Sequence, residues 1–224
     1  MSRVQINIAI DGPASSGKGT VARLVAQALG FQYIDTGAMF RAVALHAHES
    51  SISLNDVTAL RAMVQTMRFQ FQWLGGELRL SINGRDVTDA IRTEEVGGMA
   101  SNVALHQPVR SELLRQQQEL AKDCCVVMDG RDIGSVVLPD AHLKIYLDAS
   151  ATERGRRRLL DLQNRGIVAD FDALVGEIKA RDDQDKNREH APLIQAKDAV
   201  YIDSTTLTAE QAAERIVDLA HSRA

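Results

Sequence analysis

A glycine-rich segment near the N-terminus constrains this chain more than any other feature. The segment Gly12-Pro13-Ala14-Ser15-Ser16-Gly17-Lys18-Gly19-Thr20 lies between a β-rich apolar run at residues 4–10 and a helix-spaced apolar pattern at 18–30. Glycines let successive backbone N–H groups turn toward one anion, and the N-terminus of a helix adds positive potential there. The lysine can reach the terminal phosphates of a nucleotide. The segment therefore predicts a nucleoside triphosphate site between a strand and a helix.

The elements that follow alternate as they do in an α/β protein. A strand is expected at 31–34, and a helix follows it to about residue 49. Nearly continuous apolar runs at 126–128 and 143–147 each end at an aspartate, which is typical of strands buried on both faces. Helices are expected at 152–164 and 170–187, a strand at 199–202, and a last helix capped by Thr208 and Gln211. This order predicts a parallel sheet flanked by helices.

The alternation is interrupted between residues 51 and 92. After a helix expected at 55–67, apolar and polar residues alternate over 69–73 and again over 78–82, on either side of Gly75-Gly76. This pattern predicts an antiparallel hairpin with one apolar face, inside an inserted subdomain at 51–92. Helical patterns return at about 93–106 and 108–122.

Composition and charge exclude several other classes of protein. The 224 residues, 45 % of them hydrophobic, suit a single globular domain, 1–224. A net charge of −4 argues against binding of nucleic-acid polymers through bulk charge, and no apolar run approaches the roughly 18 residues of a membrane span. The N-terminus lacks the apolar stretch of a signal peptide. We therefore expect a cytoplasmic monomer with no membrane partner.

Two cysteines stand side by side, Cys124 and Cys125. Neighbouring residues on a strand point to opposite faces, so a shared metal site or a disulfide between them is not expected. We expect buried thiols at the start of a core strand.

Three motifs resemble those of bacterial cytidylate kinases, and a fourth is shared more widely. Gly17-Lys18-Gly19-Thr20 has the form seen in nucleoside monophosphate kinases. The other three are Asp35-Thr36-Gly37-Ala38-Met39-Phe40-Arg41, Asp129-Gly130-Arg131-Asp132-Ile133-Gly134 and Ala180-Arg181-Asp182-Asp183-Gln184-Asp185-Lys186-Asn187-Arg188. The resemblance covers nearly the whole chain. It implies a P-loop kinase fold with a core parallel sheet, a small antiparallel β subdomain at 51–92 that binds the monophosphate, and a short helical lid at 152–166.

The resemblance also implies a reaction and its site residues. The reaction is phosphoryl transfer from ATP to CMP or dCMP, in line, with Mg²⁺ and without a covalent intermediate. The ATP-binding residues would be Gly12, Pro13, Ala14, Ser15, Ser16, Gly17, Lys18, Gly19, Thr20, Arg154 and Arg158. The CMP-binding residues would be Thr36, Arg41, Ser101, Arg110, Arg131, Asp132, Arg181, Asp185 and Arg188. The catalytic residues would be Lys18, Arg131, Arg158 and Arg188.

The metal ligands would be Thr20 and Asp129. Because Gly19 stands where Ser or Thr usually follows the lysine, direct contact of Thr20 with Mg²⁺ and contact through water both stay open. Thr36 replaces the serine usual in the family and keeps its hydroxyl.

The acceptor residues have chemistry that suits cytosine. Asp132 can accept a hydrogen bond from the exocyclic amino group, and Arg110 and Ser101 can donate to ring N3 and the carbonyl. Uracil would place a carbonyl oxygen opposite the Asp132 carboxylate, which a site built for one hydrogen-bond pattern rejects. The ribose hydroxyls and the monophosphate would be bound by Arg181 and Asp185, and by Arg41, Arg131 and Arg188.

Arg181, Asp185 and Arg188 are spaced to share one face of a helix. The same spacing also suits an ion pair on a solvated surface. Two other functions stay open beside CMP phosphorylation. One is a kinase for another small acceptor such as AMP or shikimate. The other is a GTPase switch, although no Asn-Lys-x-Asp motif follows a strand and residues 185–188 are expected in a helix.

Overall fold

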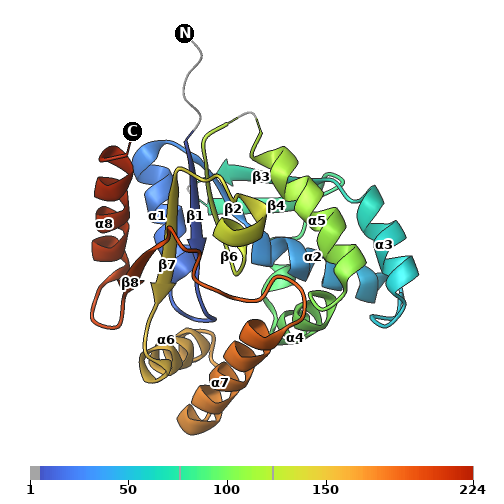
Figure 1. Ribbon diagram of the computed structural model, residues 1–224. Helices are drawn as coiled ribbons and strands as arrows, with labels where there is room; N and C mark the ends of the chain where they lie inside the picture. Colours follow the sequence, from blue (N-terminus) through green and yellow to red (C-terminus); the bar gives the residue numbers. More distant parts are fainter. Residues whose placement is uncertain (1–5, 76, 123, 224) are drawn as a thin grey trace. The chain divides into compact units, whose positions relative to one another are not determined.

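Five strands form the main sheet of the structure, a computed structural model that describes residues 6–75, 77–122 and 124–223 (Figure 1). The spatial order is β2-β6-β1-β7-β8, and the strands are β1 (Asn7–Asp11), β2 (Gln32–Asp35), β6 (Val126–Gly130), β7 (Leu143–Asp148) and β8 (Val200–Asp203). β1 pairs in parallel with β6 and with β7, and β7 pairs in parallel with β8. The predicted parallel sheet is confirmed. Residues 4 and 5 of the first predicted strand lie outside the described residues.

The contacts within the chain divide it into two units. Unit 1 is the chain up to Tyr33 and again after Lys122, and unit 2 is Ile34–Lys122. Unit 2 contains the expected insertion at 51–92 and extends beyond it in both directions, because helices on either side of the insertion pack on each other.

In the described part of unit 1, the α-helices beside the sheet are α1 (Lys18–Leu29), α6 (Ala151–Asn164), α7 (Phe171–Asn187) and α8 (Ala209–His221). α1 packs on α8, and α6 packs on α7 (Figure 1). The predicted capping box of Thr208 and Gln211 starts α8. Ile8, Ile10 and Leu147 are fully buried in the sheet. Each such side chain contributes on the order of 1.5–3 kcal/mol to the stability of the fold through burial. The central strands therefore hold the loops at their ends in fixed positions.

Unit 2 combines helices with a three-stranded antiparallel sheet. The helices are α2 (Thr36–Glu49), α3 (Val57–Thr66), α4 (Glu94–Val103) and α5 (Gln107–Leu120), with a 3₁₀ turn at Ala90–Arg92. The strands are β3 (Phe69–Leu74), β4 (Glu77–Ile82) and β5 (Arg85–Asp86). Phe71 lies opposite Leu80, and both are buried, while Gln70 and Gln72 are exposed. The predicted hairpin is confirmed. Gly76 of its predicted turn lies outside the described residues.

The two cysteines lie before β6 and are only half-buried. The Cys125 sulfur accepts a hydrogen bond from the Ile6 N–H at 3.3 Å, and the Cys124 thiol donates to Gln32 Oε1 at 3.1 Å. The expectation of buried thiols in a core strand is therefore wrong. The reason is that β6 begins at Val126, so both thiols lie in the segment that leads into the strand.

Candidate active site

The predicted phosphate loop joins β1 to α1 in unit 1. Ser15 and Gly17 have left-handed backbone conformations, with φ of 58° and 87°. A Cβ added to Gly12 would lie 2.0 Å from the Leu147 carbonyl oxygen, so only glycine allows the loop to pass this close to β7. The Ser16 hydroxyl is buried without a hydrogen-bond partner among the described residues. The loop thus combines left-handed turns with a buried hydroxyl that is free to bind a ligand.

Lys18 is the first residue of α1 and is buried. Its ammonium group donates a hydrogen bond to the Pro13 carbonyl oxygen at 3.0 Å. Burial and the nearby Arg131 guanidinium lower the pKa of the Lys18 ammonium to about 7, although the Asp129 carboxylate opposes them. An anionic ligand placed here would restore the charged form.

Asp129 lies near the loop, as predicted for a residue that ends a core strand. It is buried in β6, and its Oδ1 accepts a hydrogen bond from the Tyr33 hydroxyl at 2.8 Å. A Cβ on Gly19 would lie 3.4 Å from that hydroxyl and 4.0 Å from Asp129 Oδ2. Gly19 therefore leaves room for the Tyr33–Asp129 pair. Sequence reasoning did not identify Tyr33, because nothing in a strand pattern shows which residue its hydroxyl will meet.

Asp129 and the exposed Thr20 offer hard oxygen ligands, which suit Mg²⁺ bound mainly by water and phosphate oxygens. Among the described residues, no three His, Cys, Asp or Glu side chains group as a metal site of their own. The donor set thus fits an ion that would arrive with a phosphorylated ligand.

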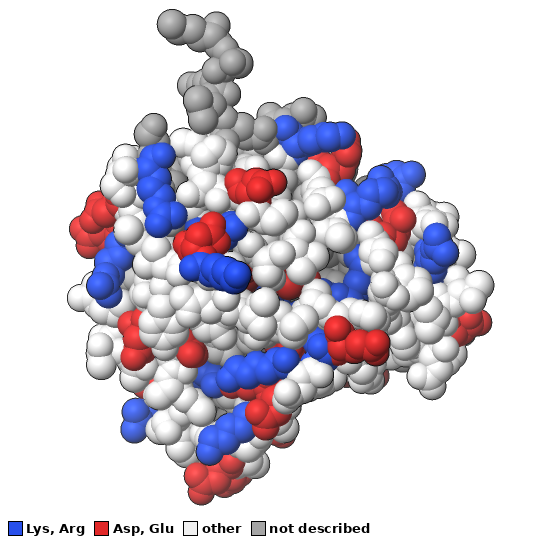
Figure 2. All heavy atoms as spheres, in the orientation of Figure 1, with Lys and Arg blue, Asp and Glu red and all other residues white. Residues whose placement is uncertain are grey.

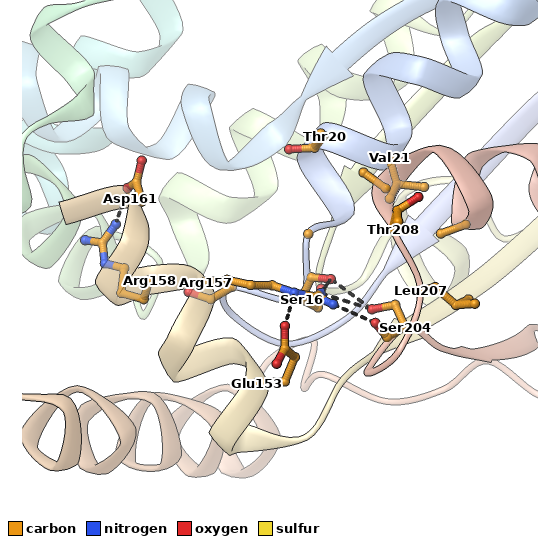
Figure 3. A pocket seen from close by; sticks show the side chains of 14 residues that line it. Ser16, Thr20, Val21, Glu153, Arg157, Arg158, Asp161, Ser204, Leu207 and Thr208 are labelled. Atoms are coloured by element: carbon orange, nitrogen blue, oxygen red, sulfur yellow. Dashed lines mark hydrogen bonds and ion pairs between the residues drawn. The ribbon is translucent and has the colours of Figure 1, made fainter. Parts of the chain in front are cut away.

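A cavity of about 490 Å³ opens beside the phosphate loop, within unit 1 (Figure 3). Its lining combines loop residues from Ser15 to Gly17 with Thr20 of α1, Arg157 and Arg158 of α6, and the segment that leads into α8. This size is typical of a site for a small molecule such as a nucleotide.

Arg157 ties α6 to the phosphate loop, and sequence reasoning missed it. Its guanidinium donates to the Ser16 carbonyl oxygen at 3.0 Å and to the Ser204 carbonyl oxygen at 2.6 Å, and it pairs with Glu153 (Figure 3). The predicted Arg158 also lines the cavity, where it pairs with Asp161 at 3.1 Å. Both arginines therefore lie next to the place where a phosphate would bind.

Arg154, predicted to bind the triphosphate, is buried at the start of α6 and contacts the phosphate loop through a backbone carbonyl. It is 4 % exposed and does not line the cavity. Its guanidinium donates to the carbonyl oxygens of Ala149 and Ala14, both at 3.0 Å, and forms a bidentate pair with Asp182 of α7. These contacts connect the phosphate loop, the end of β7 and α7.

Five of the predicted acceptor residues lie in unit 1 and form a charged cluster. Arg131 donates to Asp185 at 2.7 Å, Arg188 lies 3.7 Å from both Asp185 and Asp132, and Arg181 lies on α7 one turn before Asp185. Burial favours the neutral form of Asp185, but the charges of Arg131 and Arg188 outweigh it and lower the pKa of this carboxyl. Asp185 is therefore ionised and engaged with site residues, not with solvent.

The expectation that Arg188 shares a helix face with Arg181 and Asp185 is wrong. α7 ends at Asn187, and Arg188 has an extended backbone with φ −65° and ψ 143°. Its Nε donates to the Ala191 carbonyl oxygen at 2.5 Å, which holds the turned chain. The guanidinium reaches Asp132 because the chain leaves the helix at this point.

Unit 2 contains the remaining predicted acceptor residues. Thr36 is buried in the first turn of α2, which Asp35 caps by accepting the Ala38 N–H at 2.8 Å. Arg41 donates to the Ile91 carbonyl oxygen at 3.1 Å and packs against Gly97 of α4, where a Cβ would lie 3.2 Å from its guanidinium. The glycine thus makes room for Arg41.

Ser101 and Arg110 lie on α4 and α5. Ser101 donates to the Gly97 carbonyl oxygen at 3.4 Å, and the Arg110 guanidinium stacks 5.5 Å from the centre of the Phe40 ring. Contacts with Gly97 and with α2 therefore bring three of the unit 2 residues, Arg41, Ser101 and Arg110, into one neighbourhood.

Asp11, the last residue of β1, is a further buried carboxylate that sequence reasoning missed. Burial raises the pKa of the Asp11 carboxyl to about 6, against the lowering effect of hydrogen bonds from the Gly134 and Ile133 backbone. The sequence signal that could have identified Asp11 is its position directly before Gly12 of the phosphate loop.

The surface seen in Figure 2 carries acidic and basic side chains interspersed, in keeping with the small net charge. No helix in the described part of the chain is long and apolar enough to cross a membrane.

Comparison with known proteins agrees with these features. The sequence model for cytidylate kinase matches residues 8–222. The cytidylate kinase of Caldicellulosiruptor saccharolyticus is 46 % identical over 96 % of this chain and 95 % of its own, and that of Citrifermentans bemidjiense is 47 % identical over 96 % and 93 %. A crystal structure of an uncharacterized protein from Eubacterium ventriosum covers 98 % of this chain and all of its own with a TM-score of 0.56 at 12 % identity, a likeness of fold alone. The chain belongs to the cytidylate kinase family of phosphotransferases.

Proposed function

We propose that this chain transfers the γ-phosphoryl group of ATP to CMP, and also to dCMP, giving ADP and CDP or dCDP. The observation that carries the proposal is the charged cluster of Arg131, Asp132, Asp185 and Arg188, which lies in the same unit as the phosphate loop. Lys18 of that loop is close enough to Arg131 and Arg181 for their charges to lower its pKa. A donor phosphate at the loop and an acceptor phosphate at those arginines would therefore meet.

The donor binds with its phosphates in the loop from Gly12 to Thr20. The adenosine part occupies the cavity of about 490 Å³, next to Arg157 and Arg158. Residues 152–166 act as a lid that excludes water, since water would otherwise compete as acceptor.

The acceptor binds through the residues that the family resemblance implies, with the monophosphate-binding subdomain at 51–92. Asp132 accepts from the amino group of cytosine, while Arg110 and Ser101 donate to the ring. Arg181 and Asp185 bind the ribose, and Arg41, Arg131 and Arg188 bind the monophosphate, with the Thr36 hydroxyl in the same set.

The chain's main chemical task is to offset repulsion between two anions. The triphosphate carries roughly −4 and the monophosphate about −1.5 to −2 near neutral pH. Lys18, Arg131, Arg158 and Arg188 supply positive charge, and Mg²⁺ held by Thr20 and Asp129 would neutralise part of the phosphate charge. An oxygen of the monophosphate bonds to the γ-phosphorus while the bond to the β,γ-bridging oxygen breaks, and ADP leaves. Such a loose, in-line transfer needs positioning and electrostatics more than a strong base.

The test is ADP production from Mg-ATP with CMP, dCMP, UMP, AMP and shikimate as separate acceptors. Strong turnover with CMP and dCMP, weak turnover with UMP and none with AMP is the expected result. Turnover only with AMP or shikimate would discard the acceptor assignment and keep the phosphate loop. Folded protein that binds ATP without any acceptor-dependent turnover would favour the alternative of a GTPase-like switch.

We also propose that the chain is a monomer. Sedimentation of the active protein tests this oligomeric state.

Replacing Asp132 with alanine should narrow the preference for CMP over UMP. Loss of the buried acceptor for the cytosine amino group costs about 1–3 kcal/mol, or roughly five- to 150-fold in kcat/KM for CMP. UMP makes no such bond, so its kcat/KM should fall far less. The Arg188–Asp132 contact at 3.7 Å is lost with either nucleotide, so the ratio of the two values isolates base reading. Equal losses would show that Asp132 faces the phosphate or serves the fold.

Binding of ATP at pH 7.5 should be accompanied by proton uptake. With a pKa of about 7 in the ligand-free protein, Lys18 is mostly neutral at this pH. A triphosphate favours the charged form, so the pKa rises and the lysine takes up part of a proton. Calorimetric titrations in buffers of different ionisation enthalpy measure this number directly. The uptake should vanish in Lys18→Met, and equal uptake by that variant would assign the proton to another group.

A further inference from the structure

Asp11 is a buried carboxylate that the proposed reaction does not use. It is 4 % exposed at the carboxyl end of β1, directly before Gly12 of the phosphate loop. A carboxylate in such a place is costly unless its oxygens accept strong hydrogen bonds. Its partners therefore indicate what it does.

Both oxygens of Asp11 accept backbone N–H groups from one turn. Oδ1 accepts from Ile133 at 2.8 Å, and Oδ2 accepts from Gly134 at 2.8 Å. Hydrogen bonds to an ionised acceptor are roughly twice as strong as neutral ones. The two bonded residues follow Arg131 and Asp132 directly, so Asp11 fixes the chain at the point where these two side chains leave it.

The turn itself is short and includes the Asp132 backbone. Its helical part is Ile133–Val137, and the Asp132 carbonyl oxygen accepts from the N–H groups of Val136 and Val137 at 2.9 and 3.1 Å. Asp132 has φ −141° and ψ 25°, outside the regular helical and extended regions. This conformation needs external support, and the Asp11 carboxylate supplies it from the neighbouring strand.

Gly134 allows the close approach. A Cβ there would lie 3.4 Å from Asp11 Oδ2 and 3.2 Å from Lys144 Cδ. The glycine that ends the Asp129–Gly134 motif therefore has a physical reason in the contact with Asp11 and Lys144.

We propose that Asp11 is a positioning residue that holds the Arg131-Asp132 segment in the geometry for acceptor binding, and so sets the preference for cytosine. The proposal rests on the proposed function, because that function assigns Arg131 and Asp132 to the acceptor. Both Asp11 oxygens accept from backbone N–H groups, and the proposed function assigns Asp11 to neither substrate. It acts through the two backbone N–H groups.

The test is Asp11→Asn in the full chain. The amide keeps one acceptor oxygen and places an NH₂ group against a backbone N–H, so one of the two bonds is lost. We expect kcat/KM for CMP to fall at least tenfold, mainly through KM, with a smaller fall for UMP, so that discrimination narrows. The dissociation constant of ADP, measured by calorimetry without acceptor, should stay within about twofold. Amide hydrogen exchange at Ile133 and Gly134 should accelerate.

Asp170→Asn is the matched control. Asp170 caps α7 by accepting the Ala173 N–H at 2.8 Å, so this substitution also replaces a carboxylate that accepts a backbone N–H, at a residue assigned to neither substrate. It should lower the melting temperature slightly and leave the CMP/UMP ratio unchanged. Should Asp11→Asn fail to fold, Gly134→Ala displaces the same turn while keeping the carboxylate. It should also lower the ratio of kcat/KM for CMP to kcat/KM for UMP.

Other outcomes overturn the proposal. Equal losses for CMP and UMP, or a parallel loss of ADP affinity, would show that Asp11 serves the phosphate loop or the fold at large. Unchanged hydrogen exchange at Ile133 and Gly134 would show that the carboxylate does not hold the turn. Failure of the proposed function gives a different result, namely no CMP-dependent turnover by the unsubstituted protein.

Discussion

Replacement of Lys18 by alanine is expected to lower kcat by about a hundredfold or more. The lysine is buried at the start of α1, within the loop proposed to bind the donor phosphates. As the γ-phosphoryl group moves, negative charge develops on the leaving oxygen, and a preorganised cation stabilises that charge most in the transition state. The loss should therefore appear in kcat and kcat/KM together, and less in the KM for ATP.

Steady-state kinetics of Lys18→Ala with ATP and CMP measure this effect. Lys122→Ala is the control, because Lys122 is exposed just after α5 and pairs with Glu119 at 3.2 Å. It should have the kcat of the unsubstituted chain. A folded Lys18→Ala protein with unchanged kcat would remove Lys18 from the mechanism.

The fold was predictable where a residue's role depends on its own neighbours in sequence. Continuous apolar runs mark the buried strands β6 and β7, and the alternation around Phe71 and Leu80 marks the antiparallel hairpin. The Thr208–Gln211 capping box is likewise a local pattern. In each case the chemistry that decides the structure lies within a few residues.

Site residues were less predictable where distant segments decide their role. In the run Arg154-Gly155-Arg156-Arg157-Arg158, helical spacing does not show which guanidinium is buried, because Asp182 lies 28 positions away. Arg157 was missed for the same reason, since Ser204 is 47 positions from it. Arg188 was placed on a helix because spacing alone does not show that the chain turns away after Asn187.

Replacement of Arg154 by alanine is expected to reduce the free energy of unfolding by about 3–5 kcal/mol, because it leaves the Asp182 carboxylate buried without its partner. The two side chains are 5 % and 9 % exposed. The substitution also leaves the carbonyl oxygens of Ala14 and Ala149 without their donor. Urea unfolding measures the change. The exposed Arg156, which pairs only loosely with Glu153 at 3.5 Å, gives the matched control Arg156→Ala, with an expected change under about 1 kcal/mol.

A second variant separates the cost of an unpaired charge from a general loss of packing. Asp182→Leu together with Arg154→Met replaces the pair by apolar side chains, and such replacements of buried ion pairs are often neutral or stabilising. The double variant should therefore be more stable than Arg154→Ala. It should still bind CMP more weakly than the unsubstituted chain. Arg154 connects Asp182 of α7 to the Ala14 carbonyl oxygen, and α7 also carries Arg181 and Asp185. Loss of that connection would therefore disturb two acceptor residues. A double variant as unstable as Arg154→Ala would show that Arg154 stabilises the structure by packing and by its carbonyl contacts, not by neutralising Asp182.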